Sequence, residues 1–147
     1  MNRKWIGIGL VALLALTVVG VAAAHQVSKI KGTPGDDQLT GTPSADVIVA
    51  RAGNDTVSAL DGNDRVFGNQ GNDSVDAGPG NDRVHGGGGN DTLAGGDGND
   101  ALFMVVDDDT VDHADCGPGD DVVWVNSAES DVHTNCETVK TVTVTDG

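Results

Sequence analysis

An aspartate recurs every nine residues along most of this chain, and these carboxylates are the side chains best suited to chemistry. From Gly32 the sequence divides into nine-residue units that run from GTPGDDQLT to MVVDDDTVD, and a tenth unit, CGPGDDVVW, follows three extra residues, His113 to Asp115. The fourth position is Gly in all but two units, and the eighth is always Val, Leu or Ile. The sixth position is Asp throughout: Asp37, Asp46, Asp55, Asp64, Asp73, Asp82, Asp91, Asp100, Asp109 and Asp121. Low-complexity drift would not hold three residue types in phase, so the period predicts a repeated structural unit.

Each unit has the pattern of a turn followed by a short strand. Gly86–Asn90 combines Gly and Asn, which tolerate positive φ, and Thr92–Ala94 would form a strand with one inward side chain. A single unit cannot bury its aliphatic residue alone, whereas stacked coils can, with their strands paired in parallel. If two units make one coil, the ten units make about five coils, and the stack is about 24 Å long. The sequence therefore predicts an all-β fold, a parallel β-roll (β-solenoid) over residues 32–124, with residues 125–147 as a small C-terminal cap.

The stacking places carboxylates of alternate units above one another along each edge of the roll. Neighbouring carboxylates one strand spacing apart repel, and a cation between them removes the repulsion. The available ligands are all oxygens, and Ca²⁺ accepts 6–8 oxygens in flexible geometry, whereas Mg²⁺ requires a tight octahedron. Several bound Ca²⁺ ions are therefore expected, with folding coupled to their binding. The alternative is that the aspartates only cap turns by accepting backbone N–H groups.

The units Gly86–Ala94 and Gly95–Phe103 resemble the RTX, or haemolysin-type, nonapeptide GGxGxDxUx, and the resemblance covers residues 32–124. It implies that each Ca²⁺ lies between one turn and the turn two repeats later. The implied carboxylate ligands are Asp37, Asp55, Asp64, Asp73, Asp82, Asp91, Asp100 and Asp109, and the implied carbonyl-donating turns contain Gly53, Gly62, Gly71, Gly80, Gly89 and Gly98. Ser44 replaces the fourth Gly in one unit and the unit Met104–Asp112 has no Gly, which makes Asp46 and Asp109 weaker candidates.

The N-terminus has the features of a secretory signal peptide over residues 1–24. Arg3 and Lys4 precede an apolar run from Ile6 to Ala23, and three alanines stand before His25. A short spacer, residues 25–31, would then lead into the repeats. An uncleaved membrane anchor is the alternative, since the run approaches the ~20 residues that span a bilayer. With either reading the acidic part of the chain is expected outside the cytoplasm, in the medium or at the cell surface, and without membrane contact once the signal is cleaved.

Charge and composition exclude several functions. The chain has 23 acidic and 8 basic residues and a net charge of −15, which opposes nucleic-acid binding. Its four His residues have no nucleophile signature nearby, so no enzymatic activity is predicted. The third position of the units is never Thr, which argues against an ice-binding face. The sequence locates no exposed apolar or aromatic patch, and a calcium-stabilised adhesin or other recognition protein remains an alternative.

The two cysteines, Cys116 and Cys136, are predicted to form a disulfide, as expected for an exported chain. The bond would close a loop of about 20 residues, which is worth ~3 kcal/mol in the chain-entropy model, and would hold the cap over the last coil. The alternative is a Zn²⁺ site, because each cysteine ends a His-x-x-Cys sequence that begins at His113 or His133.

Overall fold

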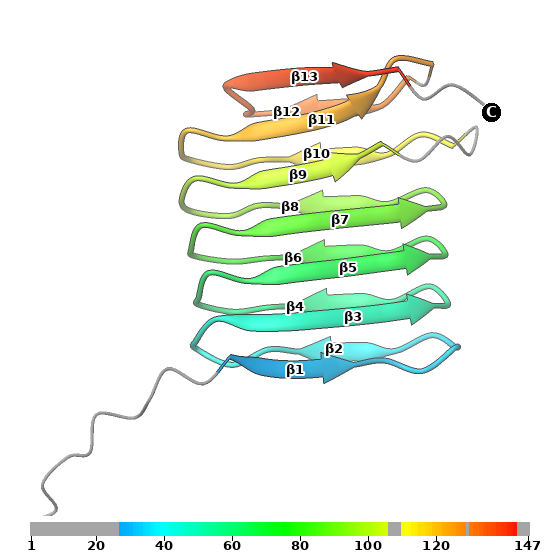
Figure 1. The fold of residues 1–147 in the computed structure, drawn as a ribbon, viewed down its shortest axis with the longest axis vertical. Helices are drawn as coiled ribbons and strands as arrows, with labels where there is room; N and C mark the ends of the chain where they lie inside the picture. Colours follow the sequence, from blue (N-terminus) through cyan, green and yellow to red (C-terminus); the bar gives the residue numbers. More distant parts are fainter. Residues whose placement is uncertain (1–26, 106–109, 129, 144–147) are drawn as a thin grey trace, which may run out of the picture.

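The computed structural model describes residues 27–105, 110–128 and 130–143, which form two facing sheets of parallel strands with no helix (Figure 1). The seven-stranded sheet contains, in spatial order, β1 (Ser28–Lys31), β3 (Asp46–Ala52), β5 (Arg65–Gln70), β7 (Arg83–Gly88), β9 (Ala101–Met104), β11 (Val122–Asn126) and β13 (Thr138–Val142). The six-stranded sheet contains β12 (Val132–Thr134), β10 (His113–Asp115), β8 (Thr92–Ala94), β6 (Ser74–Asp76), β4 (Thr56–Ser58) and β2 (Gln38–Thr40).

Successive strands alternate between the two sheets, so two nonapeptides make one coil. Val66 pairs in parallel with Ile48 on one side and with Val84 on the other. The predicted β-roll is therefore confirmed, as a solenoid of about six turns. The extra coil comes from both ends: residues 28–31, predicted as part of a spacer, form β1, and the predicted cap supplies β12 and β13 in the same parallel register.

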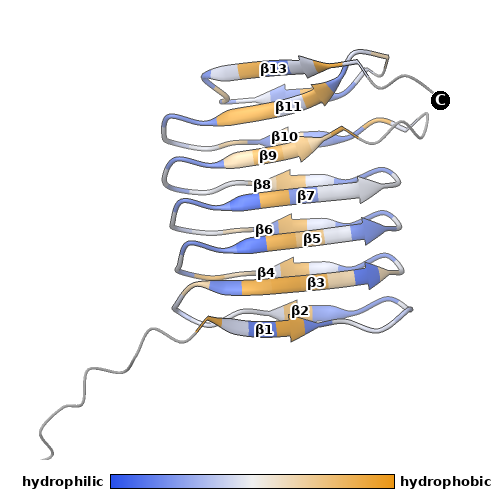
Figure 2. Cartoon of the chain, in the orientation of Figure 1, coloured by the Kyte–Doolittle hydropathy of each residue, from blue (hydrophilic) through white to orange (hydrophobic). Residues whose placement is uncertain are grey.

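The core is a narrow double row of side chains between the sheets. The aliphatic residues of position eight are buried, among them Ile48, Val57, Val66, Val75, Val84, Leu93, Leu102 and Val123. Position one also points inward and holds small residues such as Ala50, Ala59 and Ala77. Figure 2 shows apolar residues in the strands and hydrophilic residues at the turns. So thin a core supplies limited hydrophobic stabilisation for a chain of this charge.

The ninth unit has a different phase from the predicted one. His113 pairs with Thr92 and Ala114 with Leu93, so the three extra residues come before Asp112 and not after it. Ala114 is 4% exposed and occupies the inward position that was predicted for Val111, which is 36% exposed. The prediction was wrong here because a Val in phase is a stronger hydrophobic signal than an Ala. Asp109, a predicted calcium ligand, lies outside the described residues.

Each regular turn contains two residues in the left-handed region of backbone space. Position four is always a glycine there, as at Gly80 (φ 157°) and Gly98 (φ 130°). Position two is a glycine in the later turns but Arg51 (φ 91°), Leu60 (φ 72°) and Asn69 (φ 80°) in the earlier ones. Arg and Leu side chains in this region cost ~1–2 kcal/mol each, so the turns of Arg51 and Leu60 fold against a local backbone preference, whereas Asn69 tolerates this conformation.

Cys116 and Cys136 form the predicted disulfide, with their Cα atoms 5.2 Å apart. The bond joins the buried Cys116 at the end of β10 to the chain between β12 and β13, and so ties the last coils together. The zinc alternative fails because a disulfide leaves neither sulfur as a thiolate ligand. Within the ranges that the structure covers, no helix is long and apolar enough to cross a membrane.

Candidate functional site

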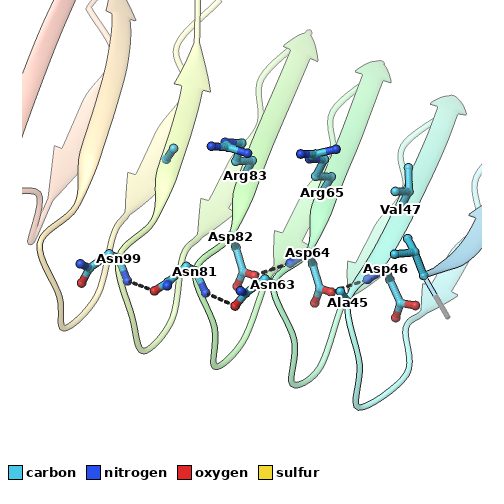
Figure 3. A pocket seen from close by; sticks show the side chains of 12 residues that line it. Ala45, Asp46, Val47, Asn63, Asp64, Arg65, Asn81, Asp82, Arg83 and Asn99 are labelled. Atoms are coloured by element: carbon cyan, nitrogen blue, oxygen red, sulfur yellow. Dashed lines mark hydrogen bonds between the residues drawn. The ribbon is translucent and has the colours of Figure 1, made fainter. Parts of the chain in front are cut away.

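The position-six aspartates form two carboxylate ladders, one along each edge of the roll. The first ladder runs along the seven-stranded sheet through Asp46, Asp64, Asp82, Asp100, Asp121 and Glu137. The second runs along the six-stranded sheet through Asp37, Asp55, Asp73, Asp91, Asp112 and Asp131. In both ladders, one oxygen of every carboxylate after the first accepts the backbone N–H of the preceding ladder residue, as Asp82 Oδ1 does from Asp64 at 2.7 Å (Figure 3). These bonds fix the position of every carboxylate with respect to its neighbours.

The second oxygen of these carboxylates lies buried in the turn. In Asp55, Asp64, Asp73, Asp82, Asp100 and Asp121 this Oδ2 atom is inaccessible to solvent and has no hydrogen-bond donor among the described residues. The residues themselves are at most 2% exposed. A buried carboxylate oxygen without a partner is costly, because the water that it gives up on folding is not replaced. Two rows of such oxygens lack a partner, and a series of bound cations would supply one.

Burial has a large effect on the acidity of these groups. It raises the pKa of Asp64, Asp73 and Asp100 to about 6 and that of Asp82 to about 7. Desolvation is the largest cause; the N–H bond to each carboxylate lowers the pKa and the neighbouring carboxylate raises it again. The pKa of Asp121 is also raised, first by burial. These five aspartates therefore resist ionisation in the absence of a cation.

Backbone carbonyls are the other oxygens near each turn. Within the described ranges no group of three or more acidic, His or Cys side chains converges on one point, so an ion between two turns would need carbonyl ligands. Position-four glycines place such carbonyls along the stack: a Cβ at Gly80 would collide with the carbonyl oxygen of Gly62, and one at Gly98 with that of Gly80. The six predicted glycines, Gly53, Gly62, Gly71, Gly80, Gly89 and Gly98, all occupy these stacked positions with positive φ.

The first two turns differ from the rest. Their position two is Thr33 or Thr42, and neither adopts positive φ. The Thr33 hydroxyl donates to Asp37 Oδ2 at 3.0 Å, and the Thr42 hydroxyl lies 3.1 Å from Asp46 Oδ2. The backbone N–H groups of the same threonines also donate to these oxygens. In these turns the interpretation of aspartate as a turn cap applies, and the carboxylate oxygen is already satisfied.

The sequence did not identify the C-terminal members of the ladders as site residues. Asp112 donates its N–H to Asp131, and Asp121 donates to Glu137 Oε2 at 2.8 Å. Asp121 was recognised as a position-six residue but set aside because it follows a phase slip. A search that allowed a spacing of 21 residues in place of 18 would have found both Asp112 and Asp121.

The raised pKa values predict that, without Ca²⁺, acid stabilises the roll. Asp64, Asp73, Asp82 and Asp100 bind protons in the folded state at pH values where the unfolded chain, with a carboxyl pKa near 3.8, does not. Stability therefore rises as the pH falls from about 7 towards about 4. The β signal of chelated protein in circular dichroism, which reports the folded fraction, is expected to be larger at pH 5 than at pH 8. His85, whose pKa burial lowers, acts in the opposite direction, and H85Q removes that contribution. A β signal that falls on acidification in H85Q would contradict the prediction.

Comparison with known proteins agrees with the ladder geometry. Residues 31–66 and 67–102 match a family model described as RTX calcium-binding nonapeptide repeat (4 copies). No curated protein and no solved structure matches the chain. The matched residues contain Asp55, Asp64, Asp73, Asp82 and Asp100, whose buried Oδ2 atoms have no hydrogen-bond donor among the described residues.

Proposed function

Since residues 31–102 place this chain in the RTX calcium-binding nonapeptide repeat family, we propose that it is a secreted protein that folds by binding a row of Ca²⁺ ions. One observation carries the proposal: within the described residues both ladders contain buried carboxylate oxygens without donors, in turns that also bring backbone carbonyls close together. This donor set suits a hard cation with several oxygen ligands. The repeat is a structural calcium-binding module, and the absence of enzymatic activity remains a prediction.

The proposed ligands come from turns that lie one coil apart on the same edge. Carboxylates of Asp55, Asp64, Asp73, Asp82, Asp91 and Asp100 would bind Ca²⁺ together with carbonyls of the turns that contain Gly53, Gly62, Gly71, Gly80, Gly89 and Gly98. We add Asp121 to this set, because its Oδ2 is also buried and no described residue donates a hydrogen bond to it. Bound Ca²⁺ would supply the positive charge that removes the repulsion along each ladder.

Position two decides which turns take an ion. A β-branched residue disfavours positive φ, and Thr33 and Thr42 instead close the first two turns on Asp37 and Asp46. Asp37 is therefore a weaker ligand than the sequence indicated. We expect the ions to occupy the roll from the turn of Asp55 onwards.

Coupling between binding and folding gives the protein a physical reason to respond to its location. Ligand that binds only the folded state stabilises it, and a chain with a thin core depends on that contribution. Extracellular Ca²⁺-binding modules commonly need ~10⁻⁴–10⁻³ M Ca²⁺. The chain would thus stay loosely structured at low cytoplasmic Ca²⁺ and fold after export.

A Ca²⁺ titration of chelated protein tests this function, with circular dichroism for the fold and calorimetry for the number of ions. We expect a cooperative gain of β signal with several ions bound, and a much weaker response to Mg²⁺. Folded protein in chelator, with no heat on addition of Ca²⁺, would mean that the ladders are turn caps only. An equal gain of β signal with Mg²⁺ and with Ca²⁺ would show that the cations act by general charge screening and not at specific Ca²⁺ sites.

A further inference from the structure

The two outer faces of the roll differ in charge. All six basic residues beyond Lys4 lie exposed on strands of the seven-stranded sheet: Lys29, Lys31, Arg51, Arg65, Arg83 and Lys140. The only acidic residue in these strands is Asp46, which is 1% exposed and points inward. The exposed acidic residues of the six-stranded sheet include Asp76 and Asp115. A chain with a net charge of −15 thus presents one cationic face.

An aromatic row runs along the middle of this cationic face. Phe67, His85, Phe103 and Trp124 occupy the same register position on β5, β7, β9 and β11. Their rings stack with centroids 5.0, 4.2 and 4.5 Å apart, and Lys140 Nζ lies 4.8 Å from the Trp124 ring. The rings cover one another's faces and are each partly exposed, so they form a continuous half-apolar band.

A groove runs beside the aromatic row, along the edge of the same sheet. Its volume is about 480 Å³, and it crosses β3, β5, β7 and the start of β9. Asn63, Asn81 and Asn99 form one wall, and Arg65 and Arg83 lie side by side on the other (Figure 3). Three residues of the first ladder, Asp46, Asp64 and Asp82, line the floor of the groove and are each 1% exposed. Among the described residues neither guanidinium pairs with a carboxylate.

The groove offers hydrogen-bond donors at a regular spacing. Asn63 Oδ1 accepts the N–H of Asn81 at 2.9 Å, and Asn81 Oδ1 accepts that of Asn99 at 2.9 Å. Each amide oxygen is thereby used, and the exposed NH₂ groups remain for a ligand. These donors repeat once per strand, at about 4.8 Å, and two adjacent guanidinium groups add charge. The complementary ligand is an extended chain rich in hydroxyl and carboxylate oxygens.

We propose that this groove and the adjoining aromatic row bind a linear polysaccharide that carries carboxylate groups, laid along the axis of the roll. Hydroxyl oxygens would accept from the asparagine amides, carboxylates would pair with Arg65 and Arg83, and the apolar faces of the sugars would rest on the aromatic row. The inference needs only the folded roll and does not depend on which cation fills the ladders.

Other extended or anionic partners fit this surface less well. A nucleic-acid strand is a dense polyanion, and the overall negative charge of the protein repels it. A membrane would need protruding apolar side chains, whereas these rings are half-buried in their own stack. A peptide that adds as a strand needs a free sheet edge and not a sheet face.

The test compares two variants that make the same change on opposite edges. N81D turns a groove donor into an acceptor and keeps the oxygen that accepts the N–H of Asn99. An aspartate is compatible with this position, because Asp36 Oδ1 accepts the N–H of Asn54 in the same way, at 2.7 Å. N72D makes the same change in the equivalent turn of the other edge, where Asn72 accepts from Asn90. Binding of hyaluronan oligosaccharides to the calcium-loaded protein is measured by calorimetry, with circular dichroism to verify the fold of each variant.

We expect N81D to bind the oligosaccharide at least about tenfold more weakly and N72D to match the unchanged protein within about twofold. R65Q/R83Q is expected to lose binding as N81D does, whereas K31Q/R51Q, which removes two charges of the same face outside the groove, keeps it. Equal losses in N81D and N72D would overturn the proposal in favour of long-range repulsion. Tighter binding of duplex DNA or of anionic lipid vesicles than of hyaluronan would also overturn the proposal. Equal binding of neutral chitin oligosaccharides would overturn it as well, because the arginines would then have no role.

Discussion

Gly98→Ala is expected to destabilise the calcium-loaded roll by about 3 kcal/mol or more, with a large drop in the urea midpoint. Gly98 has φ 130°, which alanine adopts only with strain, and its new Cβ would collide with the carbonyl oxygen of Gly80 in the turn below. The collision is with backbone, so relief requires two coils to separate. Because each coil contacts only its neighbours, that separation also breaks the ladder bond between Asp82 and Asp100.

Gly35→Ala is the matched control for this substitution. Gly35 occupies the same position of the first unit, but a Cβ there would meet no atom within 4 Å. Its stability is expected to change by less than about 0.5 kcal/mol, as for most exposed positions. If Gly98→Ala were as mild as Gly35→Ala, the turns would not stack as closely as the structure indicates.

Asp82→Asn is expected to change stability with opposite signs in Ca²⁺ and in chelator. The amide keeps an oxygen that accepts the N–H of Asp64, but it removes the charge between two proposed ion sites. We therefore expect an apparent Ca²⁺ affinity at least about tenfold lower, equivalent to ~1.4 kcal/mol. In chelator the variant should be more stable than the unchanged protein at pH 8, because burial raises the pKa of Asp82 to about 7 and its ionised form is disfavoured.

Asp76→Asn removes the same charge from an exposed site on β6, outside the ladders. Three measurements on both variants distinguish a site effect from a change in net charge: calcium calorimetry, urea unfolding in Ca²⁺, and the β signal in circular dichroism in chelator. Equal behaviour of the two variants would show that Asp82 acts only through overall charge. Loss of stability by Asp82→Asn in both conditions would assign it a purely structural role.

The repeat period was enough to predict the coil, its parallel pairing and the two rows of aspartates, because every unit has to bury its aliphatic residue in the same way. A residue such as Val66 can be buried in only one register, and the ladder of Asp64 and Asp82 follows from that register. The prediction was weaker where the period breaks. In the ninth unit the hydrophobic pattern favoured Val111, and only the pairing of Ala114 with Leu93 showed the true phase.

Two features depended on tertiary structure: which carboxylate oxygens have a hydrogen-bond donor, and which side chains lie together on each outer face of the roll. Sequence alone shows that Asp37 and Asp82 share a motif position. It does not show that Thr33 donates a hydrogen bond to Asp37, or that a buried oxygen of Asp82 has no donor among the described residues. Likewise Phe67, His85 and Phe103 are 18 residues apart, and they become a continuous aromatic row only when strands stack in register. The nine-residue period and the residue types determine the coil, because they act within each unit. Contacts between coils decide which carboxylate oxygens lack a donor and which side chains touch, because those atoms come from separate units.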